Sequence, residues 1–305
     1  MKELHIGISG WRYTPWRGDF YPQGLRQKDE LRYASRAFNS IELNGSFYAL
    51  QKPERYRRWA EDTPDGFVFS VKGPRYITHT RRLKDVEEAV ANFYASGPLE
   101  LGGKLGPMLW QVPPSLKYDP DVVEAFLTLL PRTTDAALKL ARDTATRRPP
   151  EWPTAVARHP LRHAMEVRHA SFACAEFARQ LRRHNVALVF ADAPRKWPYG
   201  EDLTATDFVY LRLHGEKELY ASGYGEAALK RWSERIARWR RGLQRADAEL
   251  FDPATRGDRR QREVYCYFDN DMKVRAPYDA SQLMALLDLQ LAGRQEPGQP
   301  AGDWQ

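Results

Sequence analysis

The chain has 305 residues, of which 42% are hydrophobic and 29% charged, and this balance is typical of folded proteins rather than disordered ones. Lysine and arginine number 47 against 40 aspartates and glutamates, giving a net charge of +7 that favours anionic partners in general. No stretch approaches the roughly 18 apolar residues of a membrane span, so no membrane partner is expected.

The only two cysteines, Cys174 and Cys266, stand far apart and outside any Cys/His cluster. This spacing argues against a disulfide-stapled fold and against a structural zinc site. The N-terminal residues run into a strand-like segment without an apolar leader. Together these features predict a protein of the reducing cytoplasm.

Eight short apolar runs bounded by turn residues predict β-strands, because each is brief and contains β-branched or aromatic residues. In chain order they are Leu4–Ser9, Ser40–Asn44, Phe67–Lys72, Pro107–Val112, Ala164–Arg168, Ala187–Asp192, Phe208–His214 and Val264–Asp269.

Helical patterns lie between most of the predicted strands. They cover Asp29–Phe38, Glu54–Asp62, Val86–Tyr94, Asp121–Leu130, Ala173–His184, Glu226–Ala246 and Ala280–Leu291. Regular alternation of strand and helix predicts an α/β fold with parallel strands, and eight repeats favour a closed TIM (β/α)8 barrel over an open doubly wound sheet. The stretch Ala193–Asp207 has no clear helical pattern, so one crossover helix is expected to be degenerate.

The barrel is predicted to form a single domain over residues 1–292. Residues 293–305 are rich in glycine, proline and glutamine, and this composition predicts a disordered C-terminal tail.

Six predicted strands become polar only where they end. Side chains two residues apart in a strand point to one face, so Glu42 pairs with Asn44, Glu166 with Arg168, and Arg212 with His214. Because the carboxyl ends of barrel strands surround one mouth, these residues predict a ligand site there. The alternative is a structural layer of ion pairs without a ligand.

Four of these side chains are candidates for catalysis: Glu42 and Glu166 as general bases, and His79 and His214 as proton carriers. Lys72, Arg168 and Arg212 are candidates for holding an anion, and aromatic residues on the following loops are expected to wall the site. The full set predicted to bind substrate is Trp11, Tyr13, Asn44, Phe47, Tyr48, Lys72, Gln111, Arg168, Asp192, Arg212 and Asn270.

The same mouth also offers possible metal ligands, because Glu42, Glu166, Asp192 and His214 could supply oxygen and imidazole donors. The three neighbouring cations would crowd such an ion, so no cofactor or metal is predicted and a divalent ion is the alternative. HExxH, GxSxG and Gly-rich phosphate-loop motifs are absent from the sequence, which argues against zincins, α/β-hydrolases and P-loop enzymes.

Several segments resemble the YecE-like family, also called domain of unknown function 72. They include the segments beginning Gly7-Ile8-Ser9-Gly10-Trp11, Ile41-Glu42-Leu43-Asn44-Gly45, Leu109-Trp110-Gln111-Val112 and Tyr210-Leu211-Arg212-Leu213-His214, together with Glu166-Val167-Arg168-His169 and Tyr267-Phe268-Asp269-Asn270. The resemblance implies a TIM barrel whose motifs gather at one pocket, and it implies no particular reaction. The family tends to have Asn-Asn after strand eight, where this chain has Asp269-Asn270-Asp271 after an insert at Gln244–Arg262.

Three functions follow from this sequence. The leading one is an enzyme that acts on a small anionic substrate, either phosphorylated or derived from a sugar. The second is a barrel that binds or processes nucleic acid, by analogy with metal-dependent endonucleases and in line with the basic charge. The third is a module that binds a small anionic ligand without converting it.

Overall fold

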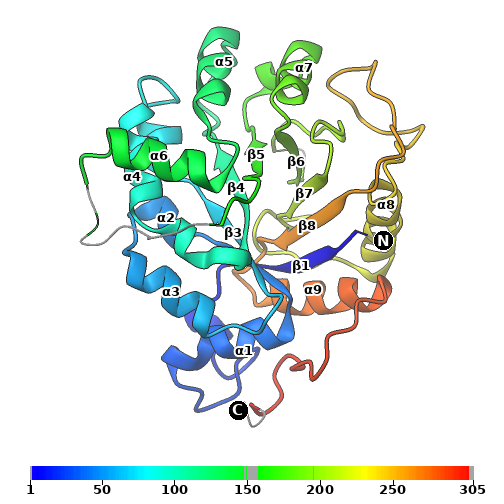
Figure 1. The fold of residues 1–305 in the computed structure, drawn as a ribbon. Coiled ribbons are helices and arrows are strands. Elements are labelled where there is room, and N and C mark those ends of the chain that lie inside the picture. Colours follow the sequence, from blue (N-terminus) through cyan, green and yellow to red (C-terminus); the bar gives the residue numbers. More distant parts are fainter. Residues whose placement is uncertain (1, 148, 150–156, 195, 302–305) are drawn as a thin grey trace.

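The computed structural model describes residues 2–147, 149, 157–194 and 196–301. Eight parallel strands pair in sequence order and close into a barrel, as the sequence predicts (Figure 1). The strands are β1 (Leu4–Ser9), β2 (Ser40–Leu43), β3 (Val68–Lys72), β4 (Leu105–Gln111), β5 (His163–Glu166), β6 (Ala187–Asp192), β7 (Phe208–Leu213) and β8 (Glu263–Phe268).

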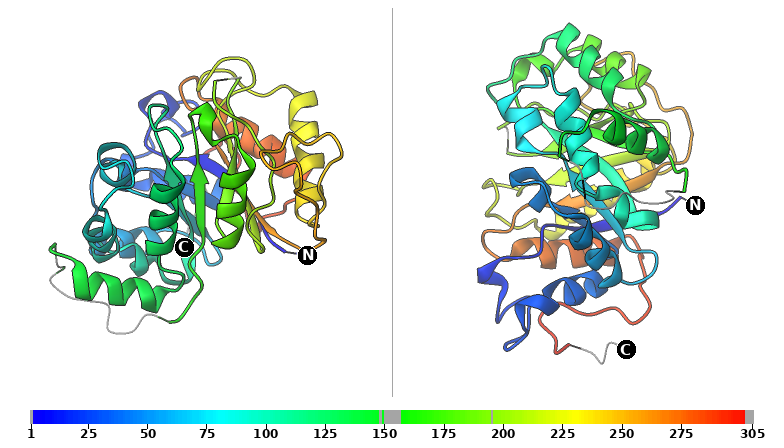
Figure 2. Two further views of the ribbon diagram at one scale, coloured as in Figure 1. Left: turned by 90° about the horizontal axis from the view of Figure 1, so that it is seen from above. Right: turned by 60° about the vertical axis from the view of Figure 1, so that its left-hand side comes forward.

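Helices surround the barrel on its outside (Figure 2), which confirms the TIM-barrel prediction. They are α1 (Glu30–Ala37), α2 (Gly45–Tyr48), α3 (Pro53–Glu61), α4 (Glu87–Ala95), α5 (Pro120–Leu129), α6 (Thr134–Thr144), α7 (Ala175–Arg183), α8 (Glu226–Trp239) and α9 (Arg275–Leu286). The described residues between β6 and β7 form no helix, so that crossover is degenerate as expected.

Two helices, α2 and α6, were not predicted, and α8 ends seven residues before the predicted boundary at Ala246. Gly242 stops α8, since its φ of 67° lies in the left-handed region and Leu243 N donates to Arg238 O at 3.0 Å. This hydrogen-bond pattern around a left-handed glycine is a common helix terminus.

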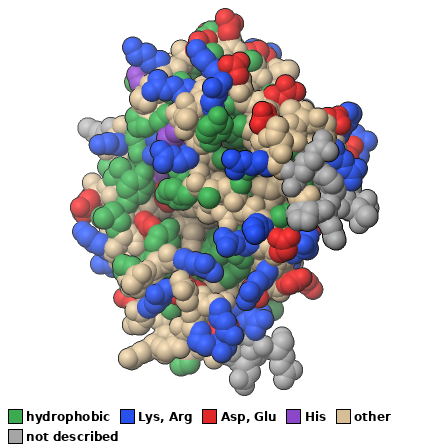
Figure 3. All heavy atoms as spheres, turned by 90° about the vertical axis from the view of Figure 1, so that its left-hand side faces the viewer, with side chains coloured by type: hydrophobic (Ala, Val, Ile, Leu, Met, Phe, Trp, Pro, Cys, Tyr) green, Lys and Arg blue, Asp and Glu red, His purple; other side chains and the backbone are tan. Residues whose placement is uncertain are grey.

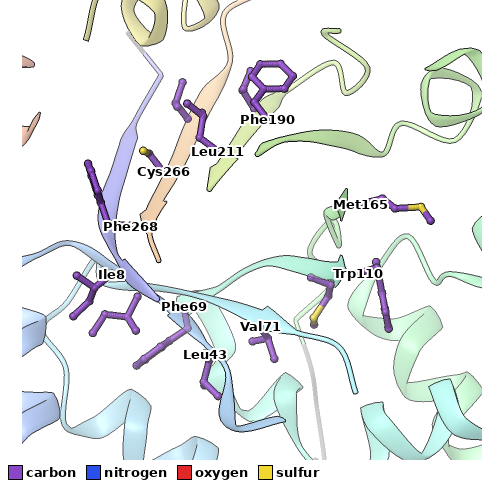
Figure 4. Packing of buried hydrophobic residues seen from close by; sticks show 14 of the residues in the cluster. Ile8, Leu43, Phe69, Val71, Trp110, Met165, Phe190, Leu211, Cys266 and Phe268 are labelled. Atoms are coloured by element: carbon purple, nitrogen blue, oxygen red, sulfur yellow. The ribbon is translucent and has the colours of Figure 1, made fainter. Parts of the chain in front are cut away.

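The strands alternate between two environments. Their outward side chains pack against the helices in one large apolar cluster, of which Figure 4 shows members such as Leu43, Phe69 and Leu211. Their inward side chains form a second cluster inside the barrel, where Tyr210 and Tyr267 are fully buried. The barrel centre is therefore packed solid, and polar groups accumulate only above this layer, at the carboxyl ends of the strands.

The C-terminal tail, predicted from its composition to be disordered, is described as far as residue 301, and residues 302–305 lie outside the described part. Its described part, residues 293–301, runs beside α1 (Figures 1 and 2), where Gln295 N donates to Arg36 O at 3.0 Å and Gly298 N donates to Phe20 O at 2.9 Å. Tyr33 Oη donates to two carbonyl oxygens of the same segment. Backbone hydrogen bonds and one buried tyrosine thus connect the described part of the segment to the barrel.

In the described part of the chain, no helix is long and apolar enough to cross a membrane.

Candidate functional site

The inward side chains at the ends of the strands form a charged layer above the tyrosines. The register of the barrel aligns Ser9 with Glu42, Gln111 with Glu166, and Arg212 with Tyr267 of the next strand. Residues two further along each strand share the inward face. The layer comprises Ser9, Glu42, Asn44, Lys72, Gln111, Glu166, Arg168, Arg212, His214 and Asp269.

Arg212 is the centre of this layer and is only 1% exposed. Its Nε and Nη2 donate to the two oxygens of Glu42 at 3.0 and 2.9 Å, and its Nη1 donates to Glu166 Oε2 at 2.6 Å. Nη2 also donates to Asp269 Oδ2 at 2.9 Å. One guanidinium thus joins carboxylates from β2, β5 and the end of β8.

Glu42 and Glu166 are fully buried beneath the mouth. Both oxygens of Glu42 accept further hydrogen bonds, from Ser9 Oγ at 2.7 Å and Tyr210 Oη at 2.7 Å. For Glu166, burial raises the pKa, but the nearby charges of Arg168 and Arg212 outweigh it and hold the pKa well below its usual range. Both oxygens of each carboxylate accept hydrogen bonds from neighbouring side chains, which favours a positioning role over the predicted role of general base.

His214 is also fully buried, and two aromatic rings pack against it. Its Nδ1 lies 3.0 Å from Asp269 Oδ2, and its ring makes edge contacts with Trp197 and Tyr220 at centroid distances of 5.0 and 5.5 Å. The structure therefore places this predicted proton carrier against Asp269, below the cavity rather than on its wall.

A cavity of about 640 Å³ opens above the charged layer. Ten of the residues predicted to form the site line it: Trp11, Tyr13, Asn44, Phe47, Tyr48, Lys72, His79, Gln111, Arg168 and Arg212. The sequence did not identify several other lining residues, among them Arg12, Arg55, Tyr220, Asp269 and Asp271. Five of the lining side chains are lysine or arginine and two are aspartate, so cations dominate the wall.

Lys72 ends β3 and is 8% exposed. Its Nζ lies 4.3 Å from the centre of the Phe47 ring, and no described residue accepts a hydrogen bond from it or lies within ion-pair distance. Burial, and then the positive charge of Arg212, lower the pKa of Lys72 to about 8.

Arg168 lies across the cavity wall with its side chain 12% exposed. Its Nε donates to Glu166 Oε1 at 2.7 Å, and its guanidinium stacks on Trp197 at 3.6 Å from the ring centre. Among the described residues, none accepts a hydrogen bond from its Nη1 or Nη2. The stack and the Glu166 contact fix a guanidinium whose outer donors remain free for a ligand.

Two titratable groups complete the wall. His79 lies on a π-helical turn, Tyr76–Thr80, and burial together with the charges of Lys72 and Arg168 lowers its pKa to about 4. Burial and the neighbouring charge of Asp269 raise the pKa of Asp271 to about 6. At neutral pH His79 is therefore uncharged, while Asp271 is mostly ionised, about one pH unit above its titration midpoint.

Asp192 and Asn270, both predicted to bind substrate, lie away from this cavity. Asp192 accepts from Tyr224 Oη at 2.8 Å beside a separate depression, and Asn270 Nδ2 donates to Asp279 Oδ2 at 2.7 Å under α9. The reason is strand periodicity, because each residue has the same parity as outward, helix-facing side chains of its strand. The opposite parity directs Asp269 inward, so the same rule would have identified it.

No three His, Cys, Asp or Glu side chains in the described ranges are grouped closely enough to hold a metal ion. Of the four donors considered from the sequence, Asp192 is directed elsewhere, and Glu42 and Glu166 are already bonded to Arg212.

The fold and the site define a (β/α)8 barrel with one cation-rich cavity at the carboxyl ends of its strands. A model of the family described as protein of unknown function DUF72 matches residues 5–303, and the chain belongs to this family. The resemblance found in the sequence is thereby confirmed.

Relatives and solved structures agree with this assignment. The chain is 34% identical over 90 residues to UPF0759 protein YecE of Escherichia coli, a match that covers 30% of each protein. It is 32% identical over 119 residues to UPF0759 protein YunF of Bacillus subtilis, covering 36% of this chain and 40% of that one. The matched segments thus span less than half of these curated relatives.

A DUF72 family protein from Thermotoga maritima superimposes with a TM-score of 0.69 and 26% identity, covering 94% of this chain and 99% of that one. A DUF72 family protein from Enterococcus faecalis gives a TM-score of 0.68 at 16% identity, covering 98% and 99%, and so supports the fold.

Proposed function

We propose that the protein is an enzyme that binds a small anionic substrate, phosphorylated or derived from a sugar, in the cavity at the barrel mouth. The observation that carries this proposal is Arg168, whose outer guanidinium donors face the cavity without a described acceptor while its inner side is fixed by Glu166 and Trp197. A guanidinium held in this way is prearranged to bind a carboxylate or phosphate through two parallel hydrogen bonds.

The rest of the wall suits such a ligand. Arg12 and Arg55 add positive charge at the rim, and Phe47 and Tyr48 offer apolar surface to the body of the molecule. Asp271 is the acid–base group of this proposal, since a pKa of about 6 lets it both accept and return a proton near neutral pH. Arg212 donates hydrogen bonds to three carboxylates, and its proposed role is to hold together the charged layer beneath the cavity.

Binding of nucleic acid has less support. On the face shown in Figure 3, lysine and arginine side chains are interspersed with hydrophobic ones and do not form a continuous basic track along which a phosphate backbone could run.

A test is thermal unfolding with inorganic phosphate and a panel of small phosphorylated and carboxylated compounds. Ligand at about one hundred times its Kd adds about 2.7 kcal/mol to the free energy of unfolding, which raises Tm by several degrees. Arg168→Met should abolish the shift, while Arg241→Met, which removes an exposed arginine beyond α8, should keep it. Indifference of the wild-type protein to every anion would overturn the proposal.

A further inference from the structure

Lys72 has surroundings that an ammonium group rarely has when buried. An ammonium carries three donors, and removing it from water without acceptors is costly. At Lys72, Nζ meets the ring of Phe47 on one side and the cavity on the other, with no described acceptor.

Lys104 shows what the same fold does with a lysine that only supports structure. Its Nζ donates to Ala60 O at 2.6 Å and to Thr63 O at 2.7 Å, and it also contacts Thr63 Oγ1 at 3.2 Å. All three donors of that ammonium have acceptors. The half-buried Lys104 thus has acceptors for its ammonium within the fold, whereas the more deeply buried Lys72 has none among the described residues.

The position of Lys72 is rigid. Its carbonyl oxygen accepts from Ser46 Oγ at 2.7 Å, and Gly73 N donates to Leu109 O at 2.8 Å, so the strand end is fixed on both sides. The end of a barrel strand is where catalytic side chains of this fold are placed. A fixed backbone and a partner-free amine are the conditions under which a lysine serves as a nucleophile rather than as a counter-charge.

We propose that Lys72 forms a covalent imine with the carbonyl group of an anionic oxo-compound bound in the cavity. This inference rests on the proposed function, since Arg168 would hold the anionic group of the same compound. It adds the substrate class, an aldehyde or ketone that carries a carboxylate or phosphate.

The step balances without any oxidant or reductant. The neutral amine attacks the carbonyl carbon, a C–N bond forms, and one proton passes from the nitrogen to the carbonyl oxygen to give a neutral carbinolamine. The new hydroxyl group then takes up one more proton, and loss of water breaks the C–O bond and leaves a protonated imine. Asp271 and neutral His79 line the same cavity and are placed to move these protons.

The electrostatics support the step. With a pKa of about 8, roughly one Lys72 side chain in ten is neutral at pH 7, compared with roughly one in three thousand for a lysine at its usual pKa of 10.5. Burial and the neighbouring Arg212 are the two ordinary ways in which an active-site lysine is made nucleophilic.

The experiment is reductive trapping. The full-length protein is incubated at pH 7 with glyoxylate, pyruvate or dihydroxyacetone phosphate in the presence of cyanoborohydride, and the adduct is located by peptide mass mapping. We expect Lys72 to be labelled on the order of ten times faster than the exposed Lys139, with a rate that saturates with the probe and falls when inorganic phosphate competes.

Two variants separate this inference from the proposed function. Lys72→Arg keeps the positive charge but forms no imine, so it should lose the adduct and keep the stabilisation by phosphate. Lys139→Arg should behave as wild type. If Lys72 of the wild-type protein is labelled no faster than Lys139 with all three probes while phosphate still stabilises the protein, the imine is refuted and anion binding stands. If phosphate does not stabilise the wild-type protein either, the proposed function fails as well.

Discussion

Replacing Lys72 by methionine should stabilise the folded protein at neutral pH while it removes the reactive amine. Lys72 is 8% exposed and lacks an acceptor among the described residues, so its charged form is disfavoured in the folded state. Methionine has similar length, is apolar and can keep the contact with Phe47.

The size of the gain follows from the pKa. A fall from 10.5 to about 8 corresponds to roughly 3 kcal/mol, at about 1.36 kcal/mol per pKa unit, and relaxation around the charge reduces this to about 1–3 kcal/mol. Because the folded state binds the proton more weakly than the unfolded state, the cost of Lys72 is fully present below pH 8. It disappears as the pH rises from 8 towards 10.5.

The assay is urea unfolding of both proteins at pH 7 and at pH 10.5. The variant should be the more stable at pH 7, and the difference should shrink at the higher pH, while Lys139→Met on the exposed face of α6 should show no such trend. A Lys72→Met variant that is less stable than wild type at pH 7, or a difference that does not change with pH, would refute the view that this amine is buried without a partner.

Three further predictions concern the charged layer, the cavity wall and the pairing of β1 with β2. Arg212→Met leaves three carboxylates without their shared cation and should cost about 3–5 kcal/mol in urea unfolding at pH 7; a loss below about 1 kcal/mol would contradict this. Asp271→Asn should stabilise the protein at pH 7 by roughly 1–2 kcal/mol, because a raised pKa makes the ionised form costly above pH 6, and the gain should vanish at pH 4, where the carboxyl is protonated. Gly7→Ala would place a Cβ 1.8 Å from the carbonyl oxygen of Ser40, so it should prevent normal pairing of β1 with β2 and abolish the cooperative unfolding transition. The control is Gly103→Ala, whose Cβ would meet no atom within 4 Å, and its free energy of unfolding should lie within about 0.5 kcal/mol of the wild-type value.

The fold was predictable because barrel strands are short apolar runs with clear ends. The predicted strands Leu4–Ser9 and Ala187–Asp192 match β1 and β6 to the residue. The helices were harder to predict from the sequence than the strands. The boundary of α8 depends on a left-handed Gly242, and the single turn α2 is too short to show a helical period.

Most of the cavity lining was predictable from the sequence, but the contacts within it were not. Polarity at the strand ends identified Lys72 and Arg168, yet it could not tell which charges pair with one another and which stay free. That distinction depends on distances across the barrel between residues far apart in sequence, such as Glu42 and Arg212, which are 2.9 Å apart. Asp271 was not predicted as an acid–base group, because burial and the charge of Asp269 raise its pKa and no sequence motif marks it.

The contacts of Arg212 also bear on how the chain folds. Its three carboxylate partners come from β2, β5 and the residue after β8, so the ends of the sequence must meet before the cluster is complete. A partly built barrel, lacking β8 beside β1, could still hold Asp269 next to Arg212 on the adjoining strand, but it would leave Arg212 without Glu42 and without a closed wall to exclude water. Closure of the barrel and assembly of the charged layer are therefore expected to be one cooperative event, late in folding, and the cavity should exist only in chains that have reached it.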